Sequence, residues 1–317
     1  MASEYAKPLP ETGRLGHAEV IEFMDPASQP SSLQPFLTDG LGRRASRADV
    51  EDYLAHLREA GVSCEVVHAG RADGLPACVC RLIIPGRSAM LMLPPHATSA
   101  DEWAWLIRQV TLDSARRGLL FTQALLEPNG HEAARLLALG GFQRLTRLIY
   151  LERQSHYPWV DGPEPEAAEW VEFSAATREL FVRTLAETYQ DSADCPELSR
   201  LRTPEDALES HRAAGRFNPG LWNLARMNGR IAGCLFLAEI AHGAALDVVY
   251  MGVTPSCRRR GIGTLLLRRA LAQCRARGIR RLSLAVDSRN ASALGLYARF
   301  AFTRLAERVV YISAGTA

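Results

Sequence analysis

Features that would place a chain in a membrane or outside the cell are missing from this sequence. No apolar run reaches the roughly 18 residues that a membrane helix needs, and the N-terminal segment lacks the apolar core of a secretory signal. The seven cysteines are scattered and odd in number, and Cys78 and Cys80 lack a second pair, which argues against a disulfide framework and a zinc site. We therefore expect a cytoplasmic protein with no membrane attachment and no metal.

A strong net charge is also missing, because 37 basic and 35 acidic residues leave a formal charge of +2. Lys7 is the sole lysine, so arginine is the ordinary surface base here and indicates function only through its position. An arginine-rich nucleic-acid module is one hypothesis for such a chain. The small net charge and the lack of aromatic residues among the arginines at 258–260 count against it, and no nucleic-acid partner is expected.

The length of 317 residues favours two domains, and the second half has the clearer order of elements. Thr203 and Pro204 have the residue types of an N-cap and a first helical position, and Asn228-Gly229 predicts a hairpin turn. The expected order is strand 170–173, helix 176–189, a loop from 191 to the N-cap, helix 204–214, strands 221–227, 231–240 and 245–253, a helix ending at 278, strand 281–286, helix 290–299 and strand 304–312.

The first half shows the same order more faintly. The expected elements are strand 20–24, helix 47–59, strands near 64–68, 76–84 and 88–93, helix 101–117, strand 119–126, helix 131–139 and strand 142–151. A segment with three prolines and several acids separates the halves and is typical of a linker. We therefore divide the chain into a domain at 1–155, a linker at 156–168 and a second domain at 169–317.

A constant offset of 160 residues aligns the two halves. It pairs identical residues in several elements, namely Gly118 with Gly278, Ala133 with Ala293, Phe142 with Phe302, Arg144 with Arg304, Leu145 with Leu305 and Pro95 with Pro255. A constant offset across strand, loop and helix indicates a tandem duplication.

The segment Arg258-Arg259-Arg260-Gly261-Ile262-Gly263 lies where a predicted helix begins. A helix N-terminus attracts anions, and glycine allows a ligand to approach the backbone closely, so this segment predicts a phosphate site. The alternatives are turn or packing glycines beside a solvated basic surface. In the first half, Asp101 and Trp103 stand at the positions of Gly261 and Gly263, and Leu137 at that of Tyr297, so its anion site is expected to be lost.

These segments resemble the GCN5-related N-acetyltransferase (GNAT) family. Residues 258–263 are similar to its R/Q-x-x-G-x-G/A pyrophosphate loop, and 249–255 resemble its fourth strand. Residues 286–302 resemble its N-x-x-A-x-x-x-Y-x-x-x-G-F segment, matching at Asn290, Ala293, Tyr297 and Phe302. Ala301 stands where glycine is usual, a departure that matters little if the position is helical. The resemblance covers about residues 170–312, and a weaker resemblance covers about residues 20–151.

This resemblance implies an α+β (mixed α/β) fold of two tandem GNAT-like domains, each a mixed, mostly antiparallel sheet flanked by helices, the first a degenerate copy. It implies acetyl-CoA as co-substrate. The positions that would bind it are Met251, Val253, Arg258, Arg259, Arg260, Gly261, Ile262, Gly263, Thr264, Asn290, Ala293 and Tyr297.

The resemblance also suggests catalytic roles. Tyr297 would protonate the departing thiolate, although its ring could instead serve packing. Asp247 would be the general base, with Glu239 as second candidate, although Asp247 could equally be a solvated acid near a strand end. An acidic acceptor site would include Glu187, Asp191, Asp194 and Glu239, with a solvated loop as the alternative.

We therefore expect an acetyl-CoA-dependent N-acetyltransferase that modifies a primary amine of a small molecule or peptide. The alternative is a non-catalytic protein that binds or senses CoA or acyl-CoA. The tandem layout resembles the mycothiol synthase branch, which acetylates an amino-sugar conjugate, but layout alone assigns no substrate. A monomer is favoured over a homodimer, because a tandem pair can join its sheets within one chain.

Overall fold

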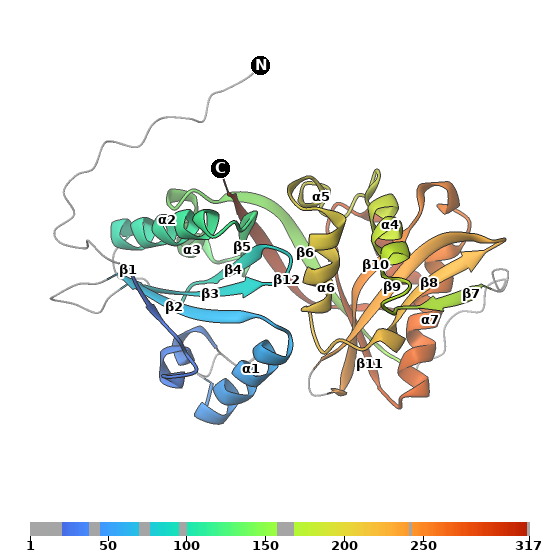
Figure 1. Cartoon of the computed structure of the whole chain (residues 1–317), viewed down its shortest axis with the longest axis horizontal. Coiled ribbons are helices and arrows are strands. Elements are labelled where there is room, and N and C mark those ends of the chain that lie inside the picture. Colours follow the sequence, from blue (N-terminus) through green and yellow to red (C-terminus); the bar gives the residue numbers. More distant parts are fainter. Residues whose placement is uncertain are drawn as a thin grey trace, which may run out of the picture.

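The computed structural model describes residues 21–37, 45–69, 77–94, 100–156, 168–240 and 243–315. Most of the expected linker, together with Val20, Pro95 and Thr98, lies outside these residues. The described strands form one 12-stranded sheet with helices on both faces (Figure 1). The two expected sheets are therefore continuous with each other.

The N-terminal half contains six strands, three α-helices and two short 3-10 helices among its described residues. Their bounds are β1 (Ile21–Met24), the 3-10 turns Pro30–Ser32 and Gln34–Phe36, α1 (Arg47–Glu59), β2 (Ser63–Ala69), β3 (Cys78–Ile84), β4 (Ser88–Met92), α2 (Ala100–Arg116), β5 (Phe121–Leu126), α3 (His131–Leu139) and β6 (Gln143–Gln154). In this half α2 and α3 cover one face of the sheet and α1 covers the other (Figure 1).

The C-terminal half repeats this order. Its elements are β7 (Glu169–Glu172), α4 (Arg178–Tyr189), α5 (Leu198–Leu201), α6 (Pro204–Arg212), β8 (Trp222–Met227), β9 (Arg230–Ile240), β10 (Ala245–Val253), α7 (Ile262–Ala276), β11 (Arg281–Asp287), α8 (Ala291–Arg299) and β12 (Thr303–Ala314), with 3-10 turns at Pro219–Leu221 and Pro255–Cys257. The short helix α5 lies in a segment that we expected to be loop throughout.

The structure preserves the repeat in detail. Adding 160 to the bounds of α3 and β6 gives the bounds of α8 and β12. Trp103, which replaces Gly263 in the repeat, is only 3% exposed and packs in one cluster with Leu91 and Leu137. The position equivalent to Gly263 is therefore part of an apolar core in the N-terminal half.

The last strand of each half pairs with the other half. The strand order is β1-β2-β3-β4-β5-β12-β6-β11-β10-β9-β8-β7. Thus β12 lies between β5 and β6, while β6 pairs with β11 and β12. Only β4–β5 and β10–β11 are parallel among the described pairs, so the sheet is mostly antiparallel. Because β12 lies between β5 and β6, and β6 lies between β12 and β11, the domain boundaries proposed at residues 155 and 169 do not divide the sheet into two separate blocks of strands.

Local sequence signals explain several element ends. Thr203 and Asp206 form a capping box with Pro204 in the first turn of α6, which satisfies backbone donors at its N-terminus. Asn228 and Gly229 both have positive φ, +48° and +75°, as a type I′ hairpin turn requires.

Ala301 does not meet the condition under which its departure from glycine would matter little. Its φ is +55°, so the position has a left-handed backbone and is not helical. Glycine adopts this conformation without the steric cost that a Cβ atom brings. The alanine therefore destabilises the turn between α8 and β12.

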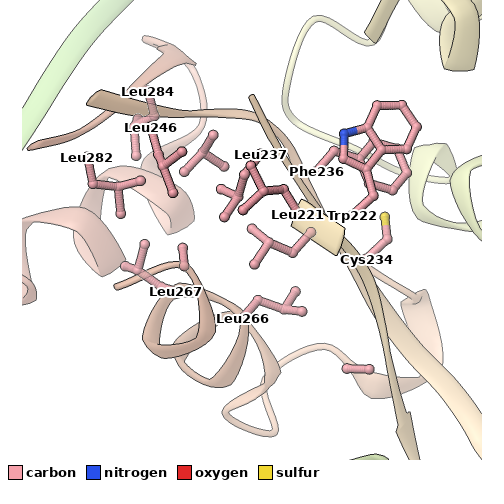
Figure 2. Packing of buried hydrophobic residues seen from close by; sticks show 14 of the residues in the cluster. Leu221, Trp222, Cys234, Phe236, Leu237, Leu246, Leu266, Leu267, Leu282 and Leu284 are labelled. Carbon is pink, nitrogen blue, oxygen red and sulfur yellow. The ribbon is translucent and has the colours of Figure 1, made fainter. Parts of the chain in front are cut away.

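The core of the C-terminal half lies on both faces of its strands. Leu266 and Leu267 of α7 point toward Leu246, Leu282 and Leu284 of the sheet (Figure 2). On the other face, the Trp222 and Phe236 rings stack with centroids 4.2 Å apart. These packed layers fix β10, β11 and α7, which carry the candidate site.

Candidate active site

The two parallel strands β10 and β11 separate halfway along their length. They pair from Ala245 with Arg281 to Val248 with Leu284, and no further pairing joins them within the described strands. A bulge lies between Val248 and Tyr250, whereas β11 stays paired with β6 to Asp287. The edge of β10 that faced β11 is therefore left without a strand partner beyond the bulge. An extended ligand can bind those backbone groups as an added strand would.

A cleft of about 520 Å³ opens where the strands separate. It runs from the separated strands to the N-terminus of α7 and is bordered by α8. Of the positions expected to bind the cofactor, all except Arg260 line this cleft, namely Met251, Val253, Arg258, Arg259, Gly261, Ile262, Gly263, Thr264, Asn290, Ala293 and Tyr297. The sequence segments that carry the family resemblance therefore meet in one place.

The N-terminus of α7 is available to an anion. Its N-cap is Gly261, with φ of +82°, and among the described residues no side chain caps this helix. By contrast, Asn290 caps α8 by accepting from the Ala293 N–H at 3.1 Å. A Cβ atom at Gly263 would approach Leu296 to 3.2 Å, so this glycine also brings α7 close to α8. The first turn of α7 thus presents backbone N–H groups and a helix dipole to the cleft.

The three arginines before this helix have different environments. The Arg258 guanidinium donates to the carbonyl oxygens of Thr188 at 3.2 Å, Gln190 at 2.5 Å and Asp191 at 3.3 Å. These carbonyls lie at the C-terminal end of α4, where a cation is electrostatically favoured. Arg259 is exposed and lines the cleft, whereas Arg260 is exposed outside it. Arg258 therefore ties α4 to the glycine loop, and Arg259 is the more accessible cation for a phosphate.

Tyr297 lies on α8 and lines the cleft, although its side chain is only 6% exposed. Its ring packs against Phe302 with centroids 5.6 Å apart. Burial, with a smaller contribution from the Asp194 charge, raises the pKa of Tyr297 above its usual range. The phenol is therefore protonated at neutral pH and can donate a proton or a hydrogen bond into the cleft.

Asp247 directly precedes Val248, which is the first residue of β10 to line the cleft. In the sheet Asp247 pairs with Ala238 on β9 and with Ser283 on β11. The Ser283 hydroxyl donates to its Oδ1 at 2.6 Å. Burial raises the pKa of Asp247 above its usual range, and the Ser283 hydrogen bond opposes that rise. A carboxylate with a raised pKa has the property that a general base requires.

The other proposed acidic residues are dispersed. Asp191 and Asp194 line the cleft, whereas Glu187 is exposed on α4 outside it. Glu239 pairs with Leu246, so it lies on the opposite face of the sheet from Asp247. Asp194 is exposed, and its Oδ1 accepts from the Asp287 N–H at 2.8 Å. The structure thus brings two of the four expected acceptor residues to the cleft.

Sequence reasoning missed a buried carboxylate at the end of β11, Asp287. Its oxygens accept from the Thr146 hydroxyl at 2.8 Å, the Cys195 N–H at 3.1 Å and the Arg289 guanidinium at 2.7 Å. Burial alone would raise the pKa of Asp287, but these hydrogen bonds lower it to about 2. The ligand atoms of Asp194, Cys195 and Asp287 lie within 4.8 Å of one another, yet those of Asp287 already serve these donors. Asp287 lies three residues before Asn290, within the segment 286–302 that resembles the family, and this position was the sequence signal that could have identified it.

Several other cleft residues were also missed, among them Thr188, Ser192, Cys257, Ala285, Ser292 and Arg299. They border the ligand space through tertiary packing, and nothing in their local pattern distinguishes them from neighbouring positions. Burial raises the pKa of the Cys195 thiol, which disfavours the reactive thiolate and argues against a nucleophilic role for this cysteine.

Comparison with known proteins gives a consistent result. Residues 185–302 match the model of the Acetyltransferase (GNAT) family. The chain is 33% identical over 294 residues to a mycothiol acetyltransferase of Thermomonospora curvata, covering 90% of this chain and 87% of that protein. A mycothiol acetyltransferase of Clavibacter sepedonicus is 27% identical, with coverage of 96% and 97%.

Solved structures show the same fold. A GCN5-related N-acetyltransferase from Sphaerobacter thermophilus superimposes with a TM-score of 0.64 at 20% identity, covering 94% of this chain and 96% of that one. A tandem GNAT protein from the clavulanic acid biosynthesis pathway gives a TM-score of 0.55 at 15% identity, with coverage of 94% and 99%. In the part of the chain that the structure describes, no helix is long and apolar enough to span a membrane.

The family match, the tandem layout and the relatives that span most of the chain agree with one another. They favour catalysis over the alternative of a non-catalytic CoA-binding protein. The chain belongs to the GNAT family and is an acetyl-CoA-dependent N-acetyltransferase.

Proposed function

We propose that the C-terminal cleft binds acetyl-CoA and transfers its acetyl group to a primary amine of a small molecule. The observation that carries this proposal is the meeting of three features in one cleft. The separated edge of β10 can pair with the pantetheine arm, the uncapped N-terminus of α7 can bind the pyrophosphate, and Tyr297 borders the same space. Arg259 supplies a further positive charge beside the phosphates.

Asp247 and Tyr297 divide the proton transfers. Asp247, directly or through one water, accepts a proton from the ammonium group, and the neutral nitrogen then attacks the thioester carbonyl. A backbone N–H of β10 near the bulge at Val248–Tyr250 stabilises the oxyanion. The C–S bond then breaks, Tyr297 donates its proton to the departing sulfur, and the attacking nitrogen loses its second proton to water. The products are an amide and free CoA, and solvent restores the phenol.

The first acceptor to test is mycothiol that lacks its acetyl group. The relatives with significant similarity are named mycothiol acetyltransferase, and four of them align with 87% or more of their own length. Asp191 and Asp194 border the cleft and would attract a protonated amine before its deprotonation. A peptide amine is the second acceptor class to compare.

We also propose that the enzyme acts as a cytoplasmic monomer without a nucleic-acid partner. One continuous sheet already joins the two halves, so the chain completes by itself an arrangement that could otherwise need two copies. The chemistry assigned to Asp247, Tyr297 and the β10 backbone requires no metal.

Calorimetric titration of acetyl-CoA into the protein and into Gly261→Asp tests the location of the site. Gly278→Asp is the matched control, because Gly278 also has a left-handed backbone, with φ of +66°, but lies beyond the far end of α7. We expect one binding site that is lost in Gly261→Asp and kept in Gly278→Asp. Binding that survives Gly261→Asp would place the site elsewhere.

Acetylation is then measured by mass spectrometry as the gain of one acetyl group on the offered amine. A free-thiol assay is unsuitable for a mycothiol acceptor, because that acceptor carries a thiol of its own. Binding of acetyl-CoA without transfer to any amine offered would contradict the proposed acceptor class.

A further inference from the structure

The segment at residues 190–212, which we call the acceptor segment, runs from the end of α4 through α5 and α6. It borders the cleft through Asp191, Ser192 and Asp194. Figure 1 shows α5 and α6 on the side of the C-terminal half that faces the N-terminal half. The N-terminal half is therefore positioned to influence this segment.

The first attachment joins the start of the segment to the end of β11. The Asp287 N–H donates to Asp194 at 2.8 Å, and the Cys195 N–H donates back to the Asp287 carboxylate at 3.1 Å. Arg289 extends the contact, since its two terminal nitrogens reach Glu197 at 2.6 Å and 2.9 Å. Asp287 is fully buried, so it has no water to replace these partners.

This attachment depends on the N-terminal half. Thr146 of β6 donates its hydroxyl to Asp287 Oδ1 at 2.8 Å, and both residues are buried. The Ser288 N–H donates to the Arg147 carbonyl at 2.8 Å, so the β6 backbone holds the following residue as well. β6 occupies this place because of the strand exchange, which brings it beside β11.

The second attachment holds the far end of the segment. The turn between β3 and β4 packs against α6, where Arg87 donates to the two carboxylate oxygens of Asp206 at 2.9 Å and 2.6 Å. The Ser210 hydroxyl donates to the Pro85 carbonyl at 2.8 Å. A Cβ atom at Gly86 would lie 1.9 Å from the Asp206 carbonyl oxygen, so only glycine permits this approach.

We infer that the N-terminal half acts as a clamp that positions the acceptor segment, with Thr146, Asp287 and Gly86 as positioning residues for the amine substrate. The clamp holds both ends of a segment that would otherwise be a loop and two short helices on the surface. This inference rests on the proposed function only in assigning the segment to the acceptor. The attachment itself follows from the hydrogen bonds and close contacts.

Two variants of the full chain test the clamp. Thr146→Val removes the hydroxyl while keeping the side-chain shape, and Gly86→Ala places a methyl group against α6. The controls are Thr111→Val, which removes a hydroxyl bond within α2, and Gly118→Ala, at a φ of +76° where an added Cβ atom would have no neighbour within 4 Å. The first control also loses a hydroxyl hydrogen bond, and the second also places alanine at a positive φ. Neither changes a residue that contacts the acceptor segment.

The first readout is hydrogen–deuterium exchange of residues 190–203 with acetyl-CoA bound. We expect exchange about five-fold faster in Thr146→Val and Gly86→Ala than in their controls. Equal exchange in variants and controls would overturn the clamp. This readout needs no acceptor, so it decides the clamp even if the proposed acceptor class is wrong.

The second readout is kinetic, with mycothiol lacking its acetyl group as the amine. We expect the KM for the amine to rise about five-fold in both variants while the KM for acetyl-CoA stays unchanged. Parallel rises in both KM values, or no rise for the amine, would overturn the positioning role. Absence of acetylation by the unmodified enzyme would count against the proposed acceptor and leave the exchange readout to decide the clamp.

Discussion

Ala301 and Gly141, 160 residues apart, occupy equivalent positions and share a left-handed backbone, with φ of +55° and +94°. The glycine of the N-terminal half meets this requirement without steric cost, whereas the alanine of the catalytic half does not. Replacing Ala301 with glycine should stabilise the protein by about 0.5–1 kcal/mol, and Gly141→Ala should destabilise it by a similar amount. Urea unfolding measures both changes in stability. An unchanged unfolding midpoint in Ala301→Gly would contradict the inference that the backbone at Ala301 is strained.

Tyr297→Phe should lower kcat about 100-fold while leaving acetyl-CoA affinity unchanged, because it removes the proton donor and keeps the packed ring. Steady-state kinetics and calorimetry separate the two effects. Tyr311→Phe is the control, since Tyr311 lies in β12 and packs against the core of the N-terminal half. Equal activity of the two variants would remove Tyr297 from the mechanism.

Asp247 should control the acidic limb of the pH profile of kcat/KM. Burial raises its pKa, and the Ser283 hydroxyl lowers it by stabilising the charged form. Ser283→Ala removes that stabilisation, so the pKa rises further and the limb should move to higher pH by about 0.5–1 unit. A shift in the opposite direction, or an unchanged limb in Asp247→Asn, would exclude Asp247 as the base.

Asp287 should contribute to stability in a defined acidic window. Its pKa is about 2 in the folded chain, below the value of about 4 expected when unfolded. Such a group stabilises the fold above the unfolded pKa, and the stabilisation is lost as pH falls from about 4 to about 2. In Asp287→Asn the loss of unfolding free energy across this window should be smaller by roughly 2 kcal/mol. Urea titrations between these pH values measure the unfolding free energy. The same dependence of that free energy on pH in the unmodified protein and in Asp287→Asn would contradict the lowered pKa of Asp287.

Much of the fold follows from local patterns in the sequence. The helices at 47–59 and 131–139 begin and end at the predicted residues. The 160-residue offset also places Trp103 and Leu137 at the positions of Gly263 and Tyr297, and both side chains are buried in the core of the N-terminal half. Apolar periodicity and glycine positions carry this information because they reflect backbone conformation and burial directly.

The features that could not be predicted all depend on pairings between distant residues. Alternation in β6 indicates a strand but does not say that its neighbours are β11 and β12. Arg258 looked like a phosphate ligand from its position, yet the end of α4 provides carbonyl partners that the motif does not reveal. Asp287 lacked any spacing signal linking it to Thr146, 141 residues earlier.

The strand exchange also has a consequence for synthesis of the chain on the ribosome. β6 pairs only with β11 and β12 among the described strands, and β5 has β12 as its outer neighbour. The N-terminal half therefore emerges with one strand unpaired and one edge open, and these are covered only after β11 and β12 have been translated. This exposed edge can associate with another chain during that interval. Rapid completion of translation, or a chaperone bound at β5, would therefore favour a correctly folded enzyme.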